Sequence, residues 1–127
     1  MHASPYDAQL DFRTLRRTPE GSTIEATVGP SHHNPTGILH GGMIAGLADS
    51  AMGETFLAGL PEGARGCGID LHLEFVGAVT EGTLTAEARV VKRGRTLTRI
   101  ACQITDADGR LVATARSSFL VLAAAPS

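Results

Sequence analysis

The sequence predicts an α+β domain in which one long helix is wrapped by a curved antiparallel sheet of about five strands. Residues 41–59 form the most apolar segment and show the 3.6-residue period of a helix. Five other segments alternate between apolar and polar residues, which is the period-two pattern of half-buried strands. Tight turns separate the last three of these segments, so we expect an antiparallel meander that curls around the helix.

The expected helix carries apolar side chains on nearly every side of a helical wheel. These residues are Met43, Ile44, Leu47, Ala48, Ala51, Met52 and Phe56. A helix that is apolar all round is a buried helix. We therefore expect residues 41–59 to lie in the core, enclosed by the sheet.

The expected strands cover residues 22–28, 67–76, 82–91, 96–106 and 111–122. Turns are expected at residues 93–95 and 106–109, and the second turn carries the Asp-Gly signal of a hairpin. We expect residues 1–21 to be an N-terminal segment with a short helix at 7–15. Residues 22–122 are then the folded domain, and residues 123–127 are a short Ala-rich tail.

Composition limits the classes of function. The chain has 127 residues, of which 43% are apolar, so one domain can build a core without disulfides or metal. A net charge of −2 and an aromatic content of 4% argue against nucleic-acid binding by basicity or base stacking. Cys67 and Cys102 lie in alternating segments and are expected to be buried thiols. No leader and no long apolar run is present, so we expect a cytoplasmic protein that binds no membrane.

Asp49 is the unusual residue of the expected helix. It lies in mid-helix among apolar residues, where an ionised carboxylate is costly unless it is paired. Gly42, Gly46, Asp49 and Gly53 fall on one stripe, and three glycines on a stripe indicate that a backbone or a ligand approaches closely. Two interpretations remain open: a structural helix contact in which Asp49 bonds a neighbouring amide, and a functional acid.

The loop before the helix, H-H-N-P-T-G-I-L-H-G-G, offers hydrogen-bond donors. A helix that begins at Gly41 and Gly42 presents unpaired N–H groups and the positive end of its dipole. Such a site suits a carbonyl oxygen that gains negative charge, and Asn34 and His40 add side-chain donors. The alternative is an ordinary loop in which Asn34 forms an Asx-turn. We expect no metal, because no Cys, Asp or Glu completes a recognised ligand spacing nearby.

The segment R-V-V-K-R-G-R-T-L-T-R, residues 89–99, is strongly basic and contains no acid. A cluster of this kind around a glycine turn suits the phosphates of an anionic ligand. The simpler interpretation is a solvated hairpin tip whose charges deter aggregation of sheet edges. From this run alone the simpler interpretation is favoured.

The motif H-N-P-T-G-I-L-H-G-G followed by L-A-D-S-A-M-G resembles hot-dog-fold acyl-CoA thioesterases, specifically the phenylacetate-pathway and 4-hydroxybenzoyl-CoA thioesterase group. The resemblance extends from about residue 24 to 122. It implies that two subunits pair through the strand 67–76, that such dimers pair again into tetramers, and that each site lies between subunits. No cofactor is implied, because coenzyme A is part of the substrate.

The resemblance also implies roles for individual residues. The Gly41 amide, next to Gly42, would polarise the thioester carbonyl, and His40 would support it. Asp49 of the partner subunit would act as general base or nucleophile, and Asn34 would orient the water or the acid. The turn formed by Arg93, Gly94, Arg95 and Thr96 would meet the nucleotide phosphates. These roles predict hydrolysis of an aryl- or medium-chain acyl-CoA to free acid and coenzyme A.

Two departures from the family pattern bear on the water molecule. Some relatives have a hydroxyl residue where this chain has Gly53, or near Gly68, so the residue that positions water is not identified. Two alternative functions remain open. One is hydration or dehydration of enoyl thioesters, for which His40 is poorly placed, and the other is non-catalytic binding of acyl thioesters.

Overall fold

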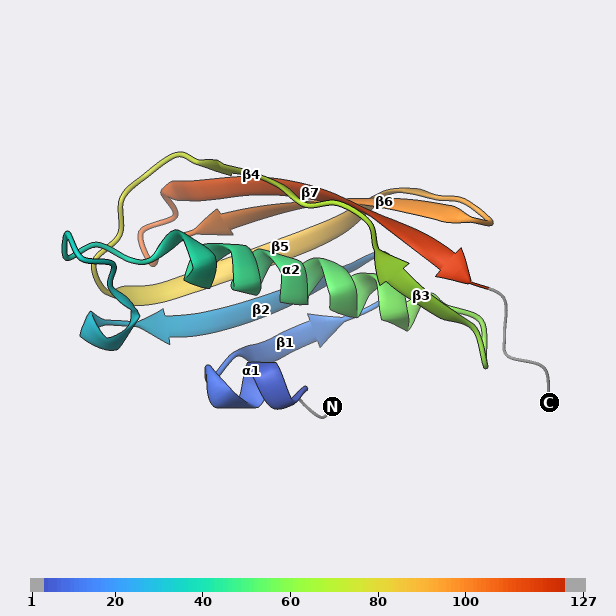
Figure 1. Cartoon of the computed structure of the whole chain (residues 1–127), viewed down its shortest axis with the longest axis horizontal. Coiled ribbons are helices and arrows are strands. Elements are labelled where there is room, and N and C mark those ends of the chain that lie inside the picture. The colour runs from blue at the N-terminus through green and yellow to red at the C-terminus, as the bar shows by residue number, and fades with distance from the viewer. Residues whose placement is uncertain (1–3, 123–127) are drawn as a thin grey trace.

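The computed structural model, which describes residues 4–122, confirms the predicted fold class. A curved antiparallel sheet lies against one long helix that crosses its concave face (Figure 1). The elements in chain order are α1 (Pro5–Gln9), β1 (Arg13–Arg17), β2 (Gly21–Val28), the 3-10 turn η1 (Pro30–His32), α2 (Gly41–Ala58), β3 (Arg65–Gly68), β4 (His72–Phe75), β5 (Gly82–Arg93), β6 (Leu97–Thr105) and β7 (Leu111–Leu122).

The sheet has the strand order β1-β2-β5-β6-β7-β3, and β4 also pairs with β7. The expected meander is present, since β5, β6 and β7 pair in sequence over long antiparallel registers. The described residues form seven strands rather than about five. One strand, β1, lies within the segment expected to precede the domain, and the strand expected at 67–76 is divided into β3 and β4.

The core lies between α2 and the strands β2, β5 and β6. The buried residues of α2 recur as neighbouring pairs, one pair per turn: Met43 and Ile44, Leu47 and Ala48, Ala51 and Met52, Thr55 and Phe56. This spacing covers one face of a helix. The expectation that α2 is buried on all sides is therefore wrong for the single chain. The face that carries Ala45, Gly46, Asp49 and Gly53 borders an open cleft.

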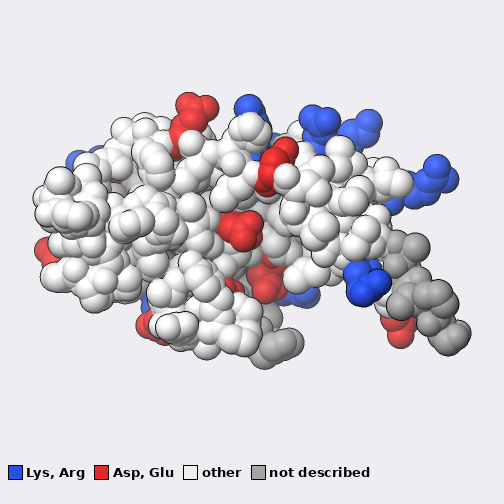
Figure 2. Space-filling view, viewed as in Figure 1, with Lys and Arg blue, Asp and Glu red and all other residues white. Residues whose placement is uncertain are grey.

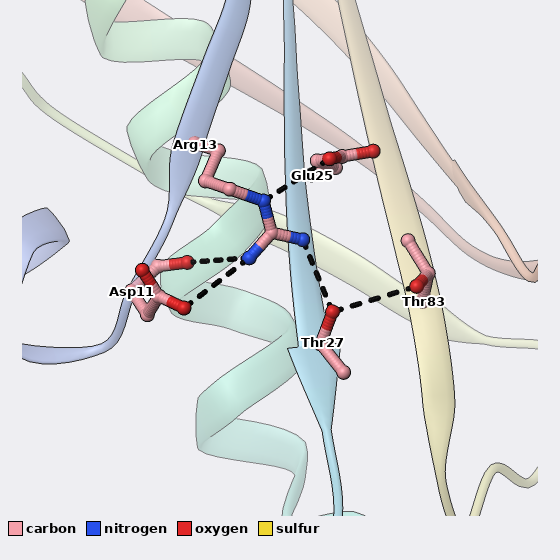
Figure 3. Close-up of polar contacts among 5 residues, drawn as sticks. All are labelled: Asp11, Arg13, Glu25, Thr27 and Thr83. Carbon is pink, nitrogen blue, oxygen red and sulfur yellow. Dashed lines mark hydrogen bonds and ion pairs between the residues drawn. The ribbon is translucent and has the colours of Figure 1, made fainter.

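The N-terminal segment differs from the expected helix at 7–15. Helix α1 ends at Gln9, and Asp11 takes a positive φ of 55°, which breaks the helix before β1 begins at Arg13. The Arg13 guanidinium then joins β1 to β2, because it donates to Glu25 Oε1 at 3.1 Å and to Thr27 Oγ1 at 3.0 Å (Figure 3). It also pairs with the Asp11 carboxylate at 3.3 Å.

The break between β3 and β4 coincides with a side-chain contact to β7. At residues 69–71 the Asp70 side chain replaces a backbone acceptor, since the Ser118 N–H donates to Asp70 Oδ1 at 2.7 Å. In this segment Ile69 and Phe75, which the alternation places on one apolar face, are 56% and 60% exposed, and Val76 beyond β4 is 57% exposed. Cys67 is likewise exposed, so the expected burial of both thiols is correct only for Cys102.

Two further expectations concern a membrane-spanning segment and the C-terminal tail. Among residues 4–122 no helix combines the length and the apolar character needed to cross a bilayer. The expected tail, residues 123–127, lies outside the described residues.

Candidate active site

Helix α2 begins with a free backbone donor. His40 is the N-cap, and its Nδ1 accepts a hydrogen bond of 2.8 Å from the Gly42 N–H. The ring proton of a neutral His40 is therefore on Nε2. Within residues 4–122 no acceptor takes the Gly41 N–H. One amide at the positive end of the helix dipole thus remains available to an oxygen atom of a ligand.

The Asn34 side chain shapes the loop that leads into α2. Its Oδ1 accepts three hydrogen bonds, from the Thr36 N–H at 2.9 Å, the Thr36 hydroxyl at 2.7 Å and the Ile38 N–H at 3.3 Å. This is the Asx-turn of the simpler interpretation. It also orients the amide so that Nδ2 remains a donor. Asn34 can therefore hold the loop and still donate to a ligand.

A cleft of about 360 Å³ lies at this end of α2. Asn34 and Gly41 supply its polar groups, and the remaining lining is apolar: Ile38, Leu39, Ile44, Phe75, Val76, Gly77, Ala78 and Val79. The Phe75 ring packs over Gly41, where an added Cβ would be 2.8 Å from the ring. Glycine at position 41 thus lets an aromatic ring cover the free amide closely.

Asp49 lines a second cleft, of about 580 Å³, on the open face of α2. Its neighbours there are Ala45, Gly46, Gly53, Gly68, Ile69, Asp70, Leu71 and Phe119. Partial burial raises the pKa of the Asp49 carboxyl above its usual value, and the nearby negative charge of Asp7 raises it further. A carboxylate with a raised pKa is a stronger base than an ordinary aspartate.

The glycine stripe has more than one role. A Cβ on Gly46 would overlap the Tyr6 hydroxyl, so this glycine accommodates α1. Gly53 meets nothing within 4 Å and opens into the Asp49 cleft. The close approach expected from the sequence is therefore made at Gly46 by a side chain of the same chain.

A single chain does not bring all the predicted residues together. Gly41 and Asn34 line one cleft and Asp49 lines the other. Eight residues of helix separate Gly41 from Asp49, which is about 12 Å along the axis. One carbonyl group cannot contact both within one chain.

The basic turn, residues 93–96, lies at the opposite end of α2 from Gly41. The Arg93 guanidinium donates to the carbonyl oxygens of Pro19 at 2.8 Å, Thr55 at 3.1 Å and Phe56 at 3.4 Å. Arg93 therefore satisfies the last turn of the helix, whereas Arg95 and Thr96 are exposed. Figure 2 shows that Lys and Arg gather toward this end, while acidic side chains lie near the centre of the face.

Two residues that were not expected near the site, Tyr6 and Asp7, contact α2 beside Asp49, at Gly46 and Ser50. The missed signal is Ser4-Pro5, an N-cap followed by proline at the first helical position, which marks a short helix at 5–9. Among residues 4–122 no group of three His, Cys, Asp or Glu side chains has the arrangement of a metal site.

Comparisons with known proteins agree with this geometry. The thioesterase superfamily matches residues 36–113. Acyl-coenzyme A thioesterase 13 from Homo sapiens is 32% identical over 117 residues, which cover 90% of this chain and 83% of the human protein. The structure of Rv1847/MT1895 from Mycobacterium tuberculosis has a TM-score of 0.92 at 27% identity, covering 97% of this chain and 100% of that one. The structure of AziG from S. sahachiroi has a TM-score of 0.91 at 28% identity, and the match covers 95% of this chain and 98% of AziG. This chain therefore belongs to the thioesterase superfamily, with its hot-dog fold, and is a thioester hydrolase.

Proposed function

We propose that this chain hydrolyses acyl-CoA thioesters with an aryl or medium-chain acyl group, as in the phenylacetate-pathway and 4-hydroxybenzoyl-CoA thioesterase group. The free Gly41 N–H at the start of α2, facing an apolar cleft, is the observation that carries the proposal. An apolar cleft of about 360 Å³ suits an acyl group of this size. The human relative, named as an acyl-coenzyme A thioesterase, supports coenzyme A as the leaving group.

The site is shared between two copies of the chain. Gly41 and Asp49 of one chain are too far apart to act on one carbonyl, so Asp49 comes from the partner. Strands β3 and β4 pair only with β7, which leaves their other edge unpaired among the described strands. The exposed apolar residues Ile69, Phe75 and Val76 lie along this edge. Pairing of two such edges buries these side chains and brings the two clefts together, and two dimers then form the tetramer.

The chemistry follows from these positions. The thioester oxygen accepts the Gly41 N–H, which stabilises the negative charge that develops when water attacks the carbonyl carbon. Asp49 takes a proton from that water as its oxygen bonds the carbonyl carbon. The C–S bond then breaks, and Asp49 returns this proton to the leaving CoA sulfur. Asn34 orients the water through Nδ2. His40 and Gly42 fix the first turn of α2 through their own hydrogen bond.

The nucleotide part of the substrate extends to the basic turn. Arg95 and Thr96 are exposed there and meet the phosphates, while Gly94 closes the turn through its N–H bond of 2.8 Å to the Leu97 carbonyl. Arg93 supports this turn from beneath, because its guanidinium is held by carbonyl oxygens of α2.

Thiol release from a panel of aryl- and alkyl-CoA thioesters tests the proposal. Asp49→Ala should reduce kcat by at least about 10³-fold while the fold remains intact. Asp11→Asn is the matched control, because this exposed acid lines neither cleft and, among residues 4–122, is paired with Arg13. Retention of activity in Asp49→Ala would contradict the assignment of the base. Binding of acyl-CoA without thiol release by the wild-type protein would indicate a binding protein instead.

A further inference from the structure

We propose that Asp7 is a positioning residue for the reaction of Asp49, because helix α1 holds this buried carboxylate on Ser50, the residue of α2 that follows Asp49. This inference rests on the proposed role of Asp49. It assigns a function in the reaction to the N-terminal segment, which the sequence places outside the catalytic domain.

Helix α1 is fixed against α2 at two consecutive residues. The Tyr6 ring packs edge-on against Phe12, with 5.9 Å between centroids, and its hydroxyl occupies the space that a Cβ on Gly46 would take. Asp7 follows, and its Oδ1 accepts a hydrogen bond of 2.7 Å from the Ser50 hydroxyl. Gly46 and Ser50 lie one helical turn apart, and Asp49 lies between them in the sequence. Helix α1 therefore sits beside the Asp49 position.

Asp7 is buried to an unusual degree for an acid. It is 3% exposed, and none of the ion pairs among residues 4–122 includes it. Burying a carboxylate without a cation destabilises a fold, and Ser50 compensates for only part of this cost. A stability role would be served better by a neutral residue of similar shape. The burial of this acid beside a second acid therefore indicates a functional role.

Among the residues that the structure describes, those lining the Asp49 cleft include no Lys, Arg or His side chain. Helix α1 contributes Asp7, which is bonded to Ser50 next to Asp49. The segment between β3 and β4 contributes Asp70, which lines the Asp49 cleft and is held by the Ser118 N–H. Strand β7 contributes only Phe119 to this cleft. On α2 itself Glu54 is paired with Arg17 at 2.6 Å. The acidic surroundings therefore favour the protonated form of Asp49, and burial and the Asp7 charge raise its pKa.

Asp7→Asn tests the inference, because the amide keeps an oxygen acceptor for Ser50 and removes the charge. Carbon-13 NMR of the Asp49 carboxyl should show its titration midpoint moving to lower pH, because a nearby negative charge has been removed. The acid limb of the kcat/KM profile should move to lower pH by the same amount. Asp7→Thr is a second, smaller neutral replacement, and it should shift the Asp49 midpoint in the same direction even where the Asn amide disturbs the fold. Asp11→Asn removes an equal but exposed charge and should move neither value.

The two readouts separate this inference from the proposed function. An Asp49 midpoint that is unchanged in both neutral variants would overturn the inference, whatever happens to activity. A shifted midpoint with an unmoved kinetic limb would support the coupling of Asp7 to Asp49 and would overturn Asp49 as the base. Shifts of equal size in both readouts would support both.

Discussion

Replacement of Arg93 by alanine separates a structural role of the basic turn from a role in substrate binding. The guanidinium bonds the last-turn carbonyls of Thr55 and Phe56 and the Pro19 carbonyl of the loop beside them. A hydrogen bond from a charged donor makes a net contribution of about 1.5 to 3 kcal/mol to stability when it is buried. The three bonds of Arg93 are partly buried or exposed, so each contributes less. The cation also interacts with the negative end of the α2 dipole, by about 0.3 to 1 kcal/mol.

Arg93→Ala should therefore lower the free energy of unfolding by about 2 to 4 kcal/mol. In a domain of this size that loss lowers Tm by roughly 8 to 15 °C. Thermal unfolding followed by circular dichroism measures it. Arg95→Ala is the matched control: this exposed residue should change stability by less than about 0.5 kcal/mol while raising KM for acyl-CoA. If Arg93→Ala keeps the wild-type Tm and raises KM as Arg95→Ala does, the guanidinium binds phosphate and the structural reasoning is wrong.

Three further outcomes follow from the geometry. Gly46→Ala should destabilise the protein and loosen α1, seen as faster amide exchange at Tyr6, because the new Cβ overlaps the Tyr6 hydroxyl. Burial and the negative charge of Glu87 raise the pKa of Cys102 to about 12, so this thiol should stay unmodified by iodoacetamide at pH 8 until the chain is unfolded. The raised pKa of Asp49 means that folding favours its protonated form, so the contribution of this carboxyl to stability decreases as pH rises above its ordinary value of 3.8. Asp49→Asn should therefore raise Tm at pH 7, and the gain should disappear as the pH falls to the ordinary aspartate range near 3.8.

The long, regular elements could be predicted from the sequence because each shows its periodicity locally. Helix α2 begins at Gly41 as expected, and β5, β6 and β7 lie where the alternation predicts them. Strand β1 could not be found this way, because four of its five residues are polar and it lies at a sheet edge, where no alternation is needed. The break at residues 69–71 depends on Asp70 and Ser118, which lie 48 residues apart.

The residues of the candidate site are marked in the sequence, whereas their arrangement in space is not. The glycines and donors before α2 and the acid within it mark the chemistry locally. Two contacts depend on the folded chain and have no local signal. Asp7 contacts Ser50, which lies 43 residues further along the chain. Arg93 contacts the last turn of α2 because the end of β5 packs beside that turn in the folded chain. A run of basic residues looks the same in sequence whether it binds phosphate or caps a helix.

Gly41→Pro tests the free amide directly. Position 41 is the first residue of α2, where proline is well tolerated, and His40 before it has the extended backbone (ψ 132°) that proline requires. The substitution removes the N–H and leaves the helix intact, so kcat should fall by about 10² to 10³-fold. Gly41→Ala is the matched control, because it introduces the same Cβ against Phe75 and keeps the N–H. Equal losses in both variants would show that crowding by Phe75, and not the missing donor, reduces activity.

Mixing of two inactive variants then tests whether the site is shared between chains. In a heterodimer of Gly41→Pro with Asp49→Ala, one site has both defects and the other has neither. Random reassortment of equal amounts makes half of the dimers mixed, so about a quarter of the wild-type activity should return. If Gly41 and Asp49 acted within one chain, every site would keep one defect and no activity would return. The shared site is proposed because Gly41 and Asp49 lie about 12 Å apart along α2 of one chain. If native mass spectrometry shows mixed dimers and no activity returns, the shared site is excluded.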